Sequence, residues 1–330
     1  MTRCLASLVA ALMCGAAAFS TASARQTGAP ADGPMSLAQI RSGIGLTRLP
    51  GSPLTFVQLT ADIRRRGVTF ILTVSEEAEL RQLGAPENLI RLLGPPRSPA
   101  ERQFWKPLTD DREMGWAPAG RLRMGSPPEE AGRDPSSEIQ GDVPVASFWL
   151  DRTEVSNDAY RRFVRAKPQW AKSKGGANYL REWTSGDEFP PAIGAQPVVF
   201  VHATAAAEYA AWAGKRLPSE EEWEYAARAQ TTGAYWWSGE FQPSMANNSE
   251  ELWEVDRAST ANPWGFFNML GNVWEWTSTS PDRDAQRRIV RGGAFDGDVS
   301  FLRAAKRTAF NQSGVAPNVG FRCALSAGAR

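Results

Sequence analysis

Residues 212–229 read WAGKRLPSEEEWEYAARA, and this stretch decides the fold. Ser219 and Glu222 have the spacing of a capping box, in which each side chain accepts a hydrogen bond from the other residue's backbone amide at a helix start. Trp223 and Ala227 then lie one helical turn apart on one face, so the sequence predicts a helix that buries this face.

Four more motifs extend the pattern in both directions. They are FWLDRTEVSNDAYRRFV (148–164), WGFFNMLGNVWEWTS (264–278), RIVRGGAF (288–295) and NVGFRCAL (318–325). Five ordered motifs are far more specific than one short match. Over about residues 110–326 the chain resembles the formylglycine-generating enzyme/sulfatase-modifying-factor family, which implies an irregular, loop-rich α+β domain of the C-type-lectin-like kind.

The residues themselves also predict an α+β domain, because short elements alternate with Gly- and Pro-rich turns. Helices are expected over 153–164, with Ser156 or Asn157 as the cap, over 203–213, and from Ser219 onward. Strands are expected over 146–150, 198–201, 288–290 and 321–324.

A small helical domain is expected over residues 35–95, before a Pro-rich linker at 96–109. One helix should begin at Ser36 and another should end at Gly67, after a run of three arginines. Thr73 and Glu76 form a further capping box, and Pro86 suits the first turn of a last helix.

The N-terminus predicts export. Residues 1–24 have a positive start, a short apolar run and an Ala-x-Ala end, which is typical of a cleaved secretory signal peptide. The protein is therefore expected in the periplasm or secreted, with no membrane span after cleavage; a retained anchor is the alternative. A net charge of +1 gives no electrostatic reason to expect nucleic-acid binding.

Cysteine content limits the chemistry. Cys4 and Cys14 lie in the signal segment, so the mature chain keeps only Cys323 and can form neither an internal disulfide nor a two-thiolate metal site. In the family a cysteine at this position can pair with one in the helix before GKRLP, but the matching residue here is Ala210. Cys323 is expected to be a small buried hydrophobe, and an exposed reactive thiol is the alternative.

The resemblance implies an oxidase whose two cysteines bind copper just after the Gly-Gly turn. The matching positions are Gly297 and Leu302, neither of which can ligate copper, so no copper cofactor is expected. A second family branch uses a histidine-rich iron site, but this chain has a single histidine, His202. We expect His202 to start a helix and predict no catalytic residue.

The resemblance also implies structural calcium. One ion would be held by Asn268, Gly271, Val273 and Glu275, and a second site would begin at Asn247 and Asn248. Amide, carbonyl and carboxylate oxygens are hard donors that suit this hard cation. The alternative is that Asn268 and Glu275 only hydrogen-bond a tight turn.

A polar substrate cleft is the last site that the resemblance implies. Its expected residues are Trp274, Asp296, Asp298, Ser300, Arg303 and Lys306. Solvated loop surface is the alternative interpretation of each residue taken alone.

Two functions follow from these patterns. The first is a non-catalytic module that binds or scaffolds a peptide or another exported protein. The second is an enzyme of the family's cysteine-less branch, which acts in the maturation of exported siderophores or natural products. A copper-dependent formylglycine oxidase is not expected.

Overall fold

The computed structural model describes residues 33–96, 103–257, 260–281 and 285–327. The predicted signal peptide at 1–24 and part of the predicted linker lie outside these ranges. Within them, none of the helices has the length and apolar character needed to cross a bilayer. The described residues from 34 onward group into one compact unit.

Four short helices follow one another near the start of the described chain: α2 (Leu37–Thr47), α3 (Phe56–Arg66), α4 (Val74–Gln82) and α5 (Glu87–Leu93). Ser36, Thr55 and Thr73 each cap a helix through a complete capping box. Gly67 ends α3 with φ 72°, a backbone conformation that favours glycine. The predicted helices are confirmed, and the exact domain boundaries stay a prediction.

The described residues beyond 103 contain three small sheets. The first pairs β1 (Phe104–Trp105), β2 (Met114–Ala117), β5 (Phe148–Asp151) and β10 (Ala324–Ser326), in that order. The second is the hairpin of β3 (Gly120–Met124) and β4 (Gly141–Val145). The third runs in the order β8 (Arg307–Asn311), β7 (Arg287–Arg291), β6 (Trp274–Trp276) and β9 (Val319–Gly320).

Two of the four strand predictions are wrong. Residues 198–201 form no strand, because Val198 donates its N–H to Val155 while Phe200 donates to Ala316, in a different segment. Residues 321–323 lie between β9 and β10, where the Phe321 carbonyl accepts from Val155 in a loop and the Cys323 carbonyl accepts from Asp151 at the end of β5. Apolar runs alone do not show which segments their main chain will meet.

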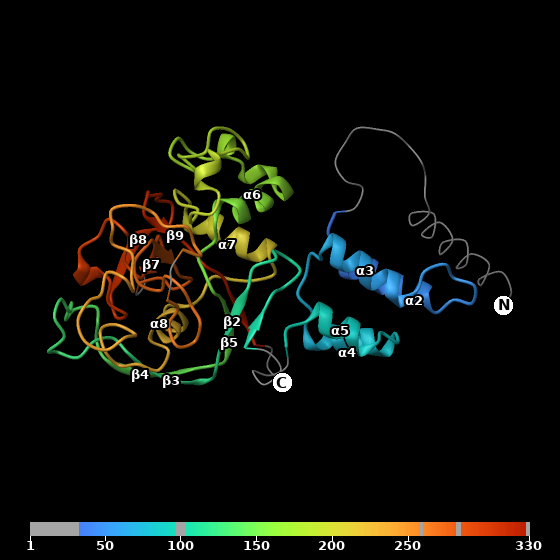
Figure 1. The fold of residues 1–330 in the computed structure, drawn as a ribbon, viewed down its shortest axis with the longest axis horizontal. Helices are drawn as coiled ribbons and strands as arrows, with labels where there is room; N and C mark the ends of the chain where they lie inside the picture. Colours follow the sequence, from blue (N-terminus) through green and yellow to red (C-terminus); the bar gives the residue numbers. More distant parts are fainter. Residues whose placement is uncertain (1–32, 97–102, 258–259, 282–284, 328–330) are drawn as a thin grey trace. The chain divides into compact units, whose positions relative to one another are not determined.

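Three further α-helices position the rest of the described domain: α6 (Asn157–Ala166), α7 (Ala203–Trp212) and α8 (Glu220–Arg228). The single-turn 3-10 helices are η1 (Pro168–Trp170), η2 (Lys172–Lys174), η3 (Pro191–Ile193) and η4 (Val299–Phe301). His202 caps α7, because its Nδ1 accepts from the Ala205 N–H at 3.2 Å, as expected for a helix start. Figure 1 shows α8 between the β3–β4 hairpin and β7.

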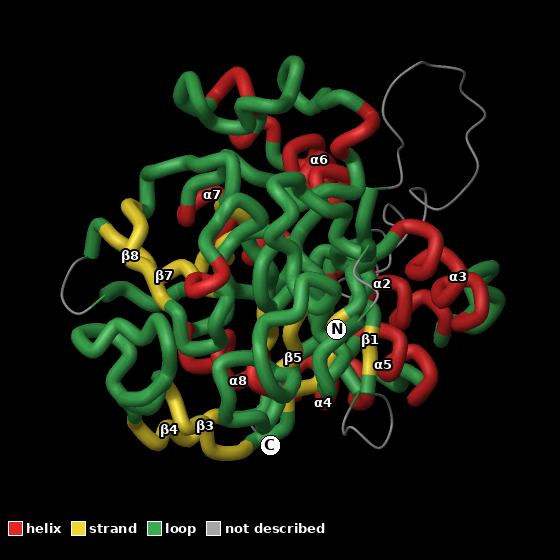
Figure 2. The backbone as a smooth tube through the Cα atoms, turned by 60° about the vertical axis from the view of Figure 1, so that its left-hand side comes forward, coloured by secondary structure: helices red, strands yellow, loops and turns green. Residues whose placement is uncertain are grey.

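Large aromatic side chains fill the core of this domain. Trp149, Trp223 and Trp276 are completely or almost completely buried, and the rings of Tyr160 and Tyr209 stack with centroids 5.7 Å apart. Figure 2 shows that loops and turns, drawn in green, make up most of the backbone beyond the first helices. The predicted irregular, loop-rich α+β fold is therefore confirmed.

Candidate functional site

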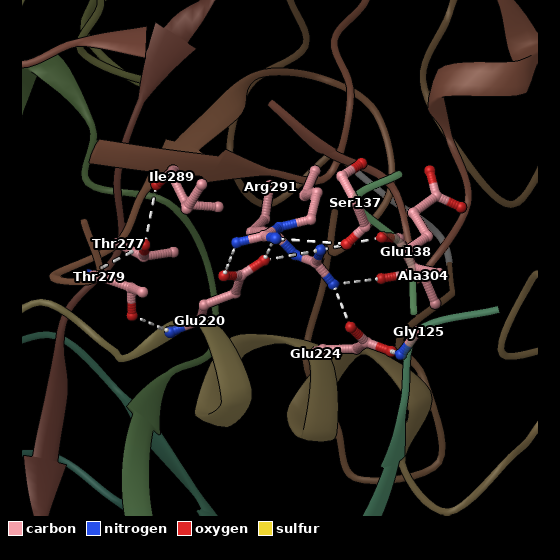
Figure 3. Close-up of polar contacts among 12 residues, drawn as sticks. Gly125, Ser137, Glu138, Glu220, Glu224, Thr277, Thr279, Ile289, Arg291 and Ala304 are labelled. Atoms are coloured by element: carbon pink, nitrogen blue, oxygen red, sulfur yellow. Dashed lines mark hydrogen bonds and ion pairs between the residues drawn. The ribbon is translucent and has the colours of Figure 1, made fainter. Parts of the chain in front are cut away.

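A buried layer of arginines and carboxylates surrounds α8. Arg291, at the end of β7, is completely buried and lies between Glu220 and Glu224 on α8 (Figure 3). Its guanidinium also donates to the carbonyls of Ala304 and Ala305, at 2.7 and 2.9 Å. A buried charge needs such compensation, since removal from water would otherwise cost several kcal/mol, as an order of magnitude.

The same layer continues on both sides of the helix. Arg307 on β8 donates to both oxygens of Glu220, at 2.7 and 2.6 Å. Arg228 donates to Glu224 at 2.9 Å, and the same carboxylate oxygen accepts from the Gly125 N–H at 2.9 Å. Glu220 and Glu224, the first and last glutamates of SEEEWEYAAR, therefore hold α8 against β7, β8 and the end of β3.

Arg303 belongs to this structural layer and does not lie at the mouth of a cleft. It is 2% exposed and donates to both oxygens of Glu138, at 2.8 and 2.9 Å, and to Glu130 at 2.7 Å. The substrate contact predicted for Arg303 stays a prediction, and its guanidinium is bound within the protein. Its guanidinium is satisfied by Glu138 and Glu130, which lie 165 and 173 residues away along the chain.

The other predicted cleft residues fall into separate groups. Trp274 is 9% exposed and lies with its ring centroid 6.3 Å from Phe301, which is 40% exposed. Asp296 accepts from the Asn318 amide at 2.9 Å, and Asp298 caps η4 by accepting from the Ser300 N–H at 2.8 Å. Among these groups, the residues that reach the surface belong to the loop 296–301, which is called the exposed loop below.

Lys306 immediately precedes β8. Its ammonium lies 5.1 Å from the centroid of the Phe301 ring, in a cation–π contact. Lys306 also lines a separate cavity beside β8, so it links the loop to that cavity.

The two positions matching the copper-binding cysteines have different surroundings. Leu302 is completely buried and packs in the core cluster that contains Trp223 and Phe266. Gly297 is half-buried in the exposed loop. Neither residue offers a thiolate, so this pair cannot hold a soft copper ion.

The residues predicted to bind calcium do lie close together in part. Asn247 forms a β-bridge with Gly271, and the Asn247 amide donates to Asn272 at 3.0 Å. Val273 is completely buried, and Asn248 is half-buried. These contacts hold the turn 268–273 against the segment 247–253.

Glu275 is the only carboxylate in that predicted set, and in this arrangement its oxygens are already occupied by protein donors. It is completely buried, and its oxygens accept from Arg322 at 2.7, 2.8 and 3.0 Å and from the Trp223 indole at 2.8 Å. The Arg322 guanidinium already neutralises the charge that calcium would need. Calcium binding stays a prediction, and the contacts suit the hydrogen-bonded turn that was its alternative.

Glu154 is a buried carboxylate that the sequence did not single out. Its oxygens accept from the amides of Asn272, at 2.7 Å, and Asn268, at 3.0 Å, and it has no ion pair in the described part of the chain. The pKa of Glu154 is raised to about 7, mainly because the carboxyl group is buried; Arg322 opposes this rise and Glu275 contributes to it.

A second missed cluster surrounds Lys215, the lysine of GKRLP. Its ammonium donates to Asp110 at 2.7 and 2.9 Å and to Asp151 at 2.8 Å, and all three side chains are completely buried. The neighbouring Cys323 N–H donates to Asp151 at 3.1 Å. Burial raises the pKa of the Cys323 thiol, so this cysteine is the inert core residue that the sequence predicted.

The fold and this charged layer define the class of protein: an irregular α+β domain in which buried arginines hold loops around one capped helix. Residues 102–327 match the sulfatase-modifying factor enzyme 1-like domain. The chain therefore belongs to the formylglycine-generating enzyme/sulfatase-modifying-factor family, and it lacks the cysteine pair that the resemblance implies.

Similar proteins include both inactive and formylglycine-generating relatives. The chain is 31% identical to inactive C-alpha-formylglycine-generating enzyme 2 of Mus musculus over 276 residues, which cover 66% of this chain and 87% of the relative. It is 28% identical to the formylglycine-generating enzyme of Mus musculus over 283 residues, 63% of this chain and 73% of that protein.

Among solved structures, PvdO from Pseudomonas aeruginosa is similar with a TM-score of 0.57 and 23% identity, over 68% of this chain and 97% of that one. Treponema denticola variable protein 1 is similar with a TM-score of 0.50 and 17% identity, over 65% and 95%. At these identities the likeness concerns the fold alone.

Proposed function

We propose that this protein is an exported, non-catalytic member of its family that binds a peptide or another exported protein. The observation that carries the proposal is the chemistry of positions 297 and 302. One is glycine and the other is a leucine buried in the core, so both thiolates are replaced by groups without any metal-ligand atom.

The polar groups near these positions also support binding over catalysis. The buried carboxylates of Glu275, Glu220 and Glu224 are each paired with an arginine inside the protein, so they serve the scaffold. The exposed loop Asp296–Phe301 instead presents an aromatic ring flanked by carboxylates and by Lys306. Exposed aromatic rings with mixed charges are typical of surfaces that bind proteins.

A copper(I) titration tests the loss of chemistry. We expect no stoichiometric copper binding by the wild type or by Gly297→Ser/Leu302→Ser, which matches cysteine in size without its thiol. Gly297→Cys/Leu302→Cys should gain a copper–thiolate absorption. Wild-type copper binding with aerobic oxidation of a cysteine-containing peptide would refute the proposal.

Affinity capture tests the binding surface. Phe301→Ala changes an exposed ring, whereas Trp274 and Arg303 are too buried for a clean test. We expect Phe301→Ala to weaken capture of an exported partner. Leu49→Ala, which changes a residue just after α2 that is 48% exposed against 40% for Phe301, should leave capture unchanged. Equal capture by both variants would refute the role of this loop, and a chemically altered partner would indicate an enzyme of the cysteine-less branch.

A further inference from the structure

A cavity of about 580 Å³ lies beside β8, apart from the exposed loop Asp296–Phe301. Its apolar lining comes from Met124, Ile139, Ile289, Ala305 and Ala309. Ile139 is 69% exposed, so a large aliphatic side chain at the rim has no cover in the described chain. The volume is in the range of sites that take small ligands or a few side chains.

The strand beside this cavity is the edge of its sheet. The strand order is β8-β7-β6-β9, and no strand in the described part of the chain pairs with the other side of β8. An edge strand presents unpaired main-chain N–H and C=O groups, to which another extended segment can add.

The hydrogen-bond pattern shows which groups of β8 face outward. On β7, Ile289 bonds toward β6, because its N–H donates to Thr279 and its carbonyl accepts from Thr277. Residues of an antiparallel strand alternate in direction, so Arg288 and Val290 must bond toward β8 instead.

Their partners in the register are Phe310 and Thr308, which therefore complete the ladder with β7. Arg307 and Ala309, the alternate residues, turn their main-chain groups toward the open edge. The cavity is lined by every residue from 305 to 309, as expected for a cavity that follows the main chain. One competitor is present, since the Arg287 guanidinium donates to the Ala309 carbonyl at 2.8 Å on the surface.

The mouth of the cavity carries charged side chains of both signs. The buried charges Arg291, Glu224 and Glu138 are all paired within the protein. Lys306 forms no ion pair within the described ranges and lies over the Phe301 ring. Asp134 accepts from the hydroxyls of Ser136 and Ser137 at 2.6 and 2.7 Å and keeps its negative charge.

We propose that this cavity and the open edge of β8 bind an extended peptide segment of another protein, which adds as a fifth strand. The segment places one aliphatic side chain against Ile139 and Ile289, pairs an acidic residue with Lys306, and displaces Arg287 from the Ala309 carbonyl. Main-chain bonds supply affinity and the cavity supplies selectivity, as in other strand-addition interactions. The inference adds a second surface to the proposed binding function.

Selection from phage-displayed random dodecapeptides on the purified protein tests this inference. Ala309→Pro removes an outward N–H while leaving the β7 ladder intact, a substitution that edge strands tolerate. Ile139→Asp places a charge at the apolar rim, and Val57→Asp is a matched control at a residue that is 79% exposed on α3. Circular dichroism and melting temperature establish that each variant is folded.

We expect enriched peptides in which apolar residues alternate, since side chains of a strand point alternately to opposite faces. Their affinity should fall at least about tenfold in Ala309→Pro and Ile139→Asp, roughly 1.4 kcal/mol, and stay unchanged in Val57→Asp. No enrichment, or peptides that neither variant weakens, would overturn the inference. If Ala309→Pro does not fold, Ile139→Asp decides alone. The copper titration tests the non-catalytic proposal separately, so either can fail alone.

Discussion

The stretch from Arg291 to Arg307 contains two regions with opposite characters. At its ends, Arg291, Arg303 and Arg307 reach carboxylates on α8 and on the segment 130–138, and the first two are completely or almost completely buried. Between them, residues 296–301 are all exposed or half-buried, and none is part of the core. The residues that make the family motif recognisable hold the scaffold together, whereas the region available for chemistry has changed. A conserved-looking motif can therefore report a fold without reporting an activity.

The largest expected effect concerns the buried layer. Arg322→Leu leaves the completely buried Glu275 without its cation, and should lower the free energy of unfolding by about 3–5 kcal/mol. Urea denaturation measures this change. The matched control Arg165→Leu breaks an exposed pair with Asp187 and should cost at most about 1 kcal/mol. Similar losses in both variants would contradict the distinction between the buried layer and the surface.

The two positions that replace the cysteines should also respond differently. Leu302→Ala creates a cavity in the core and should cost about 2–5 kcal/mol. Gly297→Ala should cost much less, at most about 1 kcal/mol, although an added Cβ would lie 3.3 Å from the Ala294 carbonyl oxygen, a tight contact that a shift of a few tenths of an ångström relieves. Thermal unfolding compares the two, and a large loss in Gly297→Ala would show that the loop is structural as well.

Local signals made the helices predictable. The capping boxes at Ser36, Thr73 and Ser219 act within three residues, so the sequence contains both partners of each contact. The site residues were harder to predict, because their contacts are distant. Asn268 meets Glu154 across 114 residues, and Arg303 meets Glu138 across 165. No local pattern shows that these groups become buried partners.

A pH dependence separates Glu154 from the carboxylates that have arginine partners. With its pKa raised to about 7, Glu154 binds its proton more tightly in the folded state than in the unfolded chain. Its contribution to stability is thus full below about pH 4.5 and is lost as the pH rises through about 7, by up to about 3 kcal/mol. Unfolding free energies of the wild type and Glu154→Gln between pH 4.5 and 8 measure this. Parallel profiles would contradict the assignment.

The smallest effect is expected for calcium. Arg322 and Trp223 already satisfy the oxygens of Glu275. The melting temperature with added calcium should therefore equal the melting temperature with a chelator. A rise that Glu275→Ala abolishes would instead establish the calcium site that the sequence predicted. For calcium to bind there, the Arg322 guanidinium would also have to move away from the Glu275 carboxylate.

The most direct test of the central claim is the intact mass of an exported partner captured by the wild-type protein. The partner would be incubated aerobically with wild type or with Phe301→Ala and weighed before and after. If the protein binds without catalysis, capture depends on Phe301 and the partner's mass stays unchanged. A mass change that occurs only with the wild-type protein would contradict the claim and make this chain an enzyme.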